Sequence, residues 1–357
     1  MDHGKTSKMK AVSLTPEGIL RWLKEDDEDK LRKLWAIADE TRKANVGDEV
    51  HLRGLVEISN HCRRSCLYCG LAVTHDSLGR YRMTIPEIVA CAAQARGFGY
   101  GTVVLQSGED FHLDGEWIAD VIRQIKHQTS LAVTLSLGER DERDLALWKL
   151  AGADRYLLRF ETSNRRLYDQ IHPAVGNVTS DRFAILRNLR SIGYEIGSGV
   201  MVGLPGQSFE DLANDIEWFG RLDLDMIGLG PYIPHDDTEL GRRRQTMMLP
   251  PDRQVPATEL MTYKMLALAR LICPQANIPS TTALATINNA TGRELGLSRG
   301  ANVIMPNVTP LKYRAMYEIY PAKVCISDSA ADCSLCVKAR IASIGRTVGK
   351  GRGDRRR

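Results

Sequence analysis

The sequence lacks any run of 18 or more apolar residues, which is the length that a membrane-spanning helix needs. Its first ten residues, MDHGKTSKMK, also lack the apolar stretch of a secretory signal. The sequence has only a small excess of positive over negative charge. The formal net charge of +4 comes from lysines near the start and arginines at the end. A solvated tail is the simplest interpretation of those arginines, although a Gly/Arg tail could touch nucleic acid. We expect a cytoplasmic protein with no membrane and no nucleic-acid partner.

A disulfide framework is not expected in a reducing compartment, although the chain has eight cysteines. Six of the eight fall in two tight groups, Cys62, Cys66 and Cys69, and Cys325, Cys333 and Cys336. The other two, Cys91 in a predicted helix and Cys273 before Pro274, are expected to be packing residues. This clustering points to bound metal rather than to cross-links.

Short β-rich runs alternate with segments long enough for a helix, which predicts a parallel sheet with crossover helices. The candidate strands cover residues 52–58, 102–106, 131–135, 155–160, 195–202, 225–230, 278–284 and 301–305. Eight strands close a barrel, so we predict an α/β fold of the (β/α)8 TIM type. The predicted parts are a tail and helical cap (1–50), the barrel (51–320), a small extension with the second cysteine group (321–346) and a disordered basic tail (347–357).

The first cysteine group follows the first predicted strand in the stretch HCRRSCLYCG, with the spacing CxxxCxxC. Three thiolates so close together can each take a different iron of a 4Fe-4S cubane. The fourth iron is then open, and S-adenosylmethionine (SAM) can chelate it while an electron cleaves the sulfonium bond. Zinc is the alternative, with His61 as fourth ligand, but adjacent His61 and Cys62 would chelate one ion awkwardly. The pattern predicts a SAM-cleaving cluster at the mouth of the barrel.

Polar residues also follow other predicted strands, at the end of a barrel where chemistry takes place. The turn after the second strand begins Ser107-Gly108-Glu109, which is either a ligand-binding segment or a plain turn with solvated acids. Arg155, Arg159 and Glu161 alternate along the fourth strand and share one face. Inside a barrel these charges need a polar ligand or a mutual ion pair, and we favour a ligand, with Glu161 near SAM and Arg159 near a substrate carboxylate.

Smaller polar groups complete the candidate site. Arg182 opens the next predicted helix and could pair with a carboxylate. Four hydroxyls lie on or near predicted strands, those of Thr134, Ser136, Thr281 and Thr282. Hydroxyls suit binding without quenching a radical, but they are also ordinary in strands.

The CxxxCxxC motif, with the aromatic Tyr68 before its last cysteine, resembles the radical SAM superfamily. The resemblance implies that Tyr68 lies beside the adenine of SAM. It also implies that Ser107, Gly108 and Glu109, which resemble a GGE motif with serine first, hold the SAM ammonium group. We assign Ser136, Glu161 and Arg182 to the same cofactor.

Within that superfamily, residues from about Val46 to Arg346 resemble the radical SAM maturases of FeFe-hydrogenase. The matching stretches are HCRRSCLYCGL, RYRMT, VLQSGED, VTLSLGE, AGADRYLLRFET, VGLPGQ, IGLGPYIPH, IPSTTAL and GANVIMPN. The resemblance implies assembly of the diiron subcluster of the hydrogenase active site, on an organometallic substrate, a cysteine-bound iron carbonyl cyanide synthon. It implies other hydrogenase maturases and a reductant protein as partners. The residues at the substrate end would be Arg53, Thr134, Arg159, Thr281 and Thr282.

The second cysteine group matches an auxiliary Fe-S site of many such maturases, either 2Fe-2S or 4Fe-4S, with zinc as the alternative. Two enzyme rivals share the barrel. A methylornithine synthase has a similar cluster loop, and a biotin synthase would need inward cysteines where this chain has threonine, serine and arginine. A noncatalytic Fe-S carrier is the rival from another class, and it would not cleave SAM.

Overall fold

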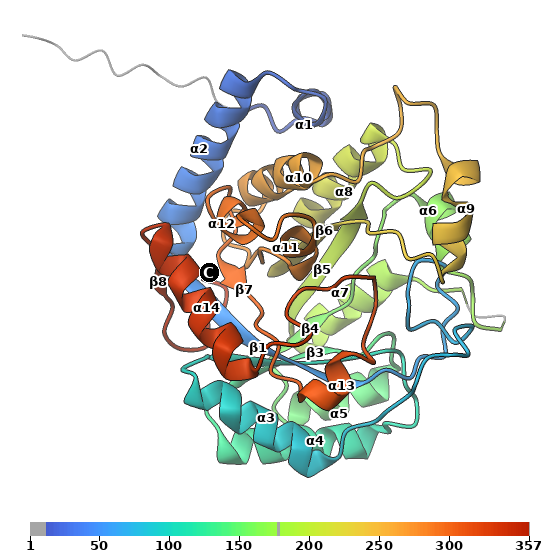
Figure 1. Cartoon of the computed structure of the whole chain (residues 1–357), viewed down its shortest axis with the longest axis vertical. Coiled ribbons are helices and arrows are strands. Elements are labelled where there is room, and N and C mark those ends of the chain that lie inside the picture. The colour runs from blue at the N-terminus through green and yellow to red at the C-terminus, as the bar shows by residue number, and fades with distance from the viewer. Residues whose placement is uncertain (1–11, 177–178, 357) are drawn as a thin grey trace, which may run out of the picture.

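The computed structural model describes residues 12–176 and 179–356, so the first eleven residues of the predicted tail lie outside it. Strands gather in the centre and helices surround them (Figure 1). The strands are β1 (Glu49–Ser59), β2 (Thr102–Ser107), β3 (Ala132–Ser136), β4 (Arg155–Leu157), β5 (Glu195–Val202), β6 (Met226–Pro231), β7 (Val303–Ile304) and β8 (Thr347–Val348). The helices are α1 (Pro16–Leu23), α2 (Glu28–Val46), α3 (Ile85–Gly97), α4 (Gly115–Gln128), α5 (Glu142–Leu150), α6 (Arg165–Ile171), α7 (Arg182–Ile192), α8 (Phe209–Arg221), α9 (Glu239–Met247), α10 (Glu259–Ile272), α11 (Thr282–Ile287), α12 (Gly292–Leu297), α13 (Leu311–Arg314) and α14 (Ala330–Ser343).

The sheet is parallel and runs in the order β6-β5-β4-β3-β2-β1-β7, with β8 paired to the start of β1. Residues 277–279 close the remaining gap, because Asn277 bridges Met226 and Pro279 bridges Val303. The Asn277 N–H donates to the carbonyl of Asp225 at 2.9 Å. The predicted parallel α/β barrel is therefore confirmed. Because its strands are parallel, the loops that follow them meet at one rim of the barrel.

Three predicted strands are longer than the observed ones, and the run at 301–305 forms a strand only over Val303–Ile304. Only residues 277–279 of the seventh run pair with strands, because Pro279 has no N–H for a ladder and Thr281 caps α11 instead. The fourth strand ends at Leu157 rather than at residue 160. There the Ser198 hydroxyl replaces the ladder, donating to the Leu158 carbonyl at 2.8 Å and accepting from the Phe160 N–H at 3.1 Å.

Helix starts follow from local sequence. Thr84 and Glu87 form a capping box at α3, and Ser208 and Asp211 form one at α8. Each capping box satisfies backbone N–H groups that a helix start leaves without partners. The N-terminal helices α1 and α2 pack on α8 and α10, which confirms the predicted helical cap.

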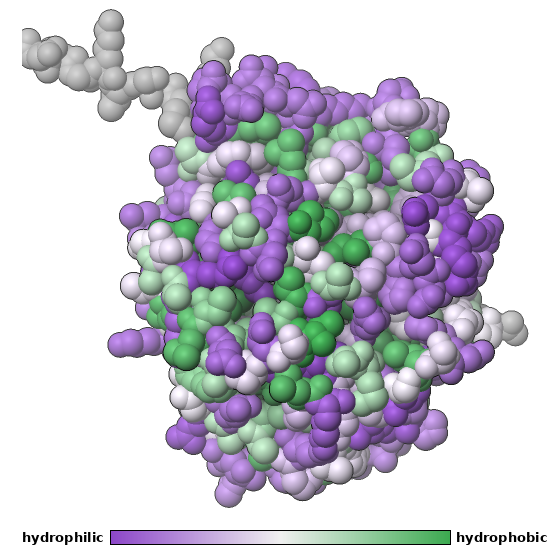
Figure 2. Space-filling model, in the orientation of Figure 1, coloured by the Kyte–Doolittle hydropathy of each residue, from purple (hydrophilic) through white to green (hydrophobic). Residues whose placement is uncertain are grey.

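The interior is apolar and continuous, and it includes Cys91 and Cys273, both predicted to be packing residues. Figure 2 shows mostly polar side chains on one face of the molecule, with apolar residues gathered near its middle. None of the described helices is both long and apolar enough to cross a membrane.

The prediction of a disordered basic tail is wrong for residues 347–356. Thr347 and Val348 form β8, and Arg352, Asp354 and Arg355 make ion pairs with residues at the starts of barrel strands. Composition alone indicated a solvated segment. The acidic and basic partners that hold it lie far away in sequence, so the pattern of the tail itself could not reveal them.

Candidate functional site

The cysteine loop after β1 lies against the turn after β2. The thiol sulfur of Cys62 accepts hydrogen bonds from the backbone N–H groups of Arg64 and Glu109, both at 3.4 Å. A Cβ atom at Gly108 would lie 2.2 Å from the carbonyl oxygen of His61 and 2.7 Å from the Cβ atom of Cys62. Glycine is therefore required at position 108, because any side chain would push the cysteine loop away.

Of the three cysteines, Cys66 is buried, and Cys62 and Cys69 are half-buried. Burial raises the pKa of the Cys69 thiol to about 12, and the neighbouring Cys62 adds to the effect. Burial and the neighbouring Cys69 also raise the pKa of Cys66. Across the described residues, no three His, Cys, Asp or Glu side chains converge as one metal ion requires. Thiolates that bind a cubane each take a different iron, so the three cysteines of this loop need not meet at one point to hold a 4Fe-4S cluster.

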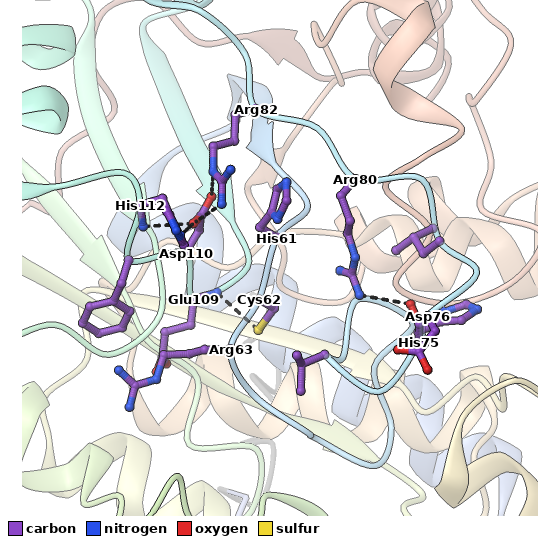
Figure 3. Close-up of a pocket in the computed structure, with 13 residues that line it drawn as sticks. His61, Cys62, Arg63, His75, Asp76, Arg80, Arg82, Glu109, Asp110 and His112 are labelled. Carbon is purple, nitrogen blue, oxygen red and sulfur yellow. Dashed lines mark hydrogen bonds and ion pairs between the residues drawn. The ribbon is translucent and has the colours of Figure 1, made fainter.

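Arg80 and Arg82 hold the outer side of this loop. They lie next to a cavity of about 380 Å³ that Cys62 also lines (Figure 3). Arg80 donates to four backbone carbonyls of the loop region, those of Asn60, Leu71, Ala72 and His75. Arg82 makes two hydrogen bonds to Asp110, at 2.7 and 3.0 Å. These contacts hold the loop without using its thiols.

A second cavity, of about 360 Å³, lies inside the barrel and is lined by Cys62 and Cys69 at the cluster end. Eleven of the twelve non-cysteine residues predicted for the site line it: Arg53, Tyr68, Ser107, Gly108, Thr134, Ser136, Arg159, Glu161, Arg182, Thr281 and Thr282. They come from strand ends and loops around the barrel. The structure thus brings the predicted SAM and substrate residues into one space next to the cysteines.

Glu109 is the exception, since its carboxylate faces the outer cavity. It accepts from Arg64 at 2.8 Å and from the backbone N–H of Glu139 at 3.0 Å. Arg64 also pairs with Glu139, whose other oxygen accepts from Arg182 at 2.9 Å. These ion pairs connect the loops at the rim of the barrel. A contact between Glu109 and SAM stays a prediction.

Residues just after β4 supply polar groups to the cavity. Arg159 Nη2 and Glu161 Oε2 form an ion pair at 3.2 Å, while Arg159 Nε has no hydrogen-bond partner. The hydroxyl of buried Thr134 also lacks one. Glu161 adopts a φ of 62°, a conformation that non-glycine residues rarely hold outside functional sites. Buried unpaired donors and acceptors are costly, so these groups indicate a polar ligand.

Arg155, on the same predicted face, is directed elsewhere. It is fully buried at the opposite end of the barrel and pairs with Glu195 at 2.6 Å and with Asp354. The interpretation of Arg155 as one of a set of ligand-facing charges is therefore wrong. Strand alternation gave the correct face, but of the three residues only Arg159 and Glu161 lie close enough to the cysteine end of the barrel to line the cavity.

The sequence did not identify several residues that also line the cavity, including Glu57, Gln106, Tyr317, Tyr320 and Lys323. Lys323 pairs with Glu57, and Asn307 donates to the other Glu57 oxygen at 2.9 Å. A glutamate inside the apolar run of the first strand was a usable signal. Lys323, Tyr317 and Tyr320 belong to a segment without periodicity, and nothing local marked them.

The second cysteine group lies in the C-terminal extension. Its cysteines are free, with Cys333 buried and Cys336 exposed at the surface. A hydrogen bond with Cys333 lowers the pKa of the Cys325 thiol, and Arg293 approaches the same sulfur at 3.9 Å. Cys325 and Cys333 are therefore neighbours in a partly cationic setting.

Asp215 of α8 stabilises the segment after Glu161 and makes stability dependent on pH. It accepts from the Ser163 N–H at 2.6 Å, and burial raises its pKa from 3.8 to about 7. Between those values the folded chain keeps a proton that the unfolded chain has lost, so stability falls as pH rises.

Asp215→Asn keeps an acceptor for Ser163, and we expect it to raise the melting temperature by about 2 °C or more at pH 8 and by less at pH 5. Thermal scans at both pH values check this, with exposed Asp252→Asn as control; an equal shift at both would contradict it.

Comparison with known proteins agrees with this geometry. Residues 56–219 match the model of the radical SAM superfamily. The FeFe hydrogenase maturase subunit HydE of Thermotoga maritima is 44% identical over 98% of this chain and 96% of its own length. A solved methylornithine synthase superposes with a TM-score of 0.77 at 22% identity, covering 95% of both chains. The FeFe-hydrogenase maturase HydG superposes with a TM-score of 0.69 at 20% identity, over 82% of this chain and 64% of its own.

The barrel, the cysteine loop and the matched model define a radical SAM enzyme, which uses a 4Fe-4S cluster and SAM. The extent of identity to the Thermotoga maritima protein goes further. The chain belongs to the HydE family of radical SAM enzymes.

Proposed function

We propose that this enzyme acts in the assembly of the diiron subcluster of FeFe-hydrogenase, as the name of its Thermotoga maritima relative suggests. The substrate is a cysteine-bound iron carbonyl cyanide synthon. One observation carries the proposal: the cavity that begins at Cys62 and Cys69 continues to the Nε of Arg159 and the hydroxyl of Thr134, which have no hydrogen-bond partner. A radical formed at the cluster end would meet an anionic, hydrogen-bonding substrate there without crossing solvent.

The residues divide into two ends of the cavity. Cys62, Cys66 and Cys69 hold the cluster, which supplies the electron that cleaves SAM to a 5′-deoxyadenosyl radical. Around SAM lie Tyr68, Ser107, Gly108, Ser136, Glu161 and Arg182, with Glu109 bracing the rim. The substrate end is formed by Arg53, Thr134, Arg159, Thr281 and Thr282.

Arg159 is expected to bind the substrate carboxylate, because its side chain is one-third exposed to the cavity and has free N–H groups. Arg159→Met should raise KM for the synthon about tenfold or more, while cleavage of SAM without substrate changes less than about twofold. Arg159→Lys should recover part of the loss, since it keeps the charge without the fork. Steady-state kinetics measure both, with exposed Arg123→Met as control. A matched loss of SAM cleavage would contradict the assignment.

The second cysteine group is proposed to hold an auxiliary Fe-S cluster, of the 2Fe-2S or 4Fe-4S type. Support comes from the adjacent Cys325 and Cys333 and from Arg293 beside them, which favours thiolates. Zinc remains the rival, and metal analysis of Cys333→Ala decides between loss of iron and loss of zinc. Partners would be other hydrogenase maturases and a reductant protein. The free thiols suit the reducing cytoplasm.

The experiment that tests the function is maturation in vitro. Apo-hydrogenase, the other maturases, the synthon and a reductant are combined with or without this enzyme, and hydrogen production is measured. Activity that depends on this chain supports the proposal. SAM cleavage without maturation, with ornithine-type products from lysine, would favour the methylornithine synthase reading, and no SAM cleavage would favour a carrier.

A further inference from the structure

The C-terminal segment, residues 349–355, crosses the end of the barrel opposite the cysteines. Its charged side chains pair with residues at the starts of β4 and β6: Arg352 with Asp154, Asp354 with Arg155, and Arg355 with Asp225 at 3.0 Å. The N–H of Arg355 also donates to Glu195 at 2.9 Å. The segment is therefore bound to β4, β5 and β6 at once.

Close backbone contacts seat the same segment on β1 and β2. A Cβ atom at Gly101 would lie 1.5 Å from the carbonyl oxygen of Gly351, and one at Gly353 would lie 2.7 Å from the His51 ring. The hydroxyl of Thr102 donates to the Arg352 carbonyl at 2.8 Å. Glycine is needed at Gly101 and Gly353 because the segment lies directly on the barrel end.

This segment also contacts two residues that line the cavity. Arg53 and Asn277 line the cavity, and each donates to the carbonyl oxygen of Gly353 at 3.1 Å. Arg53 is 4% exposed, and none of the ion pairs of the described residues includes it. Its Nε has no hydrogen-bond partner. The Gly353 carbonyl thus holds the Arg53 guanidinium while one N–H stays free.

We propose that the C-terminal segment forms the floor of the substrate cavity and positions Arg53 for an anionic substrate. This inference rests on the proposed function, because it names a positioning element for the same substrate. The floor is held by hydrogen bonds and ion pairs rather than by apolar packing, and it follows β8, the last strand of the described residues. It can therefore be removed without cutting the barrel.

A chain that ends at Lys350 tests the proposal. We expect KM for the synthon to rise about tenfold or more, while the EPR change on adding SAM and the rate of SAM cleavage stay within about twofold. The peptide GRGDRRR, added in trans at millimolar concentration, should restore part of the affinity, and a scrambled peptide should not. Asp354→Asn, which weakens the pair with Arg155, should give a smaller rise, and exposed Lys350→Ala should give none.

A labelling experiment tests the floor without any substrate. Met226, which Arg53 contacts at 3.0 Å, lines the cavity and is buried. In a Met226→Cys background, peptide mapping after treatment with an anionic methanethiosulfonate should show at least tenfold faster labelling of Cys at this position in the shortened chain. Equal labelling of the full-length and the shortened chain would overturn the proposal. An equal KM for the synthon in the two chains would also overturn it, provided that the full-length enzyme turns the synthon over. A full-length enzyme that cleaves SAM but leaves the synthon unchanged would instead refute the proposed function, and the labelling result would still decide whether the floor exists.

Discussion

Cys66→Ala should abolish reductive cleavage of SAM, with a loss of at least about 100-fold that reaches the detection limit. Cys66 is buried beside Cys69, and its thiolate is one of only three that the loop offers to the irons. A cubane with two protein ligands would dissociate or lose the arrangement that leaves one iron open for SAM. Cys62→Ala and Cys69→Ala should behave in the same way. Iron content and 5′-deoxyadenosine formation after anaerobic reconstitution measure the effect.

Cys333→Ala is the matched control for these variants. It removes a buried cysteine of the second group, in the C-terminal extension rather than in the cysteine loop. We expect it to lose iron but to keep some SAM cleavage. Equal loss of activity in all four variants would contradict the division of labour between the two cysteine groups.

Gly108→Ala should have the next largest effect, although it adds only one methyl group. The new Cβ atom would overlap the carbonyl oxygen of His61 and the Cβ atom of Cys62, so the cysteine loop must shift. The shift would also lengthen the hydrogen bond from the Glu109 N–H to the Cys62 sulfur, now 3.4 Å. We expect at least about a tenfold drop in SAM cleavage, because misplacement by about 1 Å commonly costs that much or more.

Gly97→Ala provides the control for this change. Gly97 is an exposed residue near the end of α3, and a Cβ atom there meets nothing within 4 Å. Alanine should raise stability slightly, since it restricts the unfolded chain and favours the helix. Normal iron content and normal SAM cleavage in Gly108→Ala would show that the loop can move without harm, and would contradict the account of the close contact.

The barrel could be predicted from the sequence because its strands are separated by well-marked helices. The two cysteine groups also stood out by their spacing. Where strands were misjudged, a side chain had taken the place of a backbone partner: the Ser198 hydroxyl at the fourth strand and the Thr281 cap at the seventh. Such substitutions depend on tertiary contacts that a linear pattern does not contain.

The candidate site was predictable where it lay on strand ends, since those positions share one rim. The residues that the sequence missed reach the cavity from a segment distant along the chain, as Lys323 does by pairing with Glu57. The ordered tail was missed for the same reason. Its arginines resemble a solvated stretch until Asp154 and Asp225 are placed beside them.

The central claim is that the cysteine loop holds a cluster at which SAM is cleaved, and one measurement tests it most directly. The enzyme is reconstituted with iron and sulfide without oxygen, reduced with dithionite and mixed with SAM, and then assayed for 5′-deoxyadenosine and by EPR. We predict 5′-deoxyadenosine and a 4Fe-4S signal that changes when SAM is added. A cluster that is indifferent to SAM, with no 5′-deoxyadenosine formed, would contradict the account.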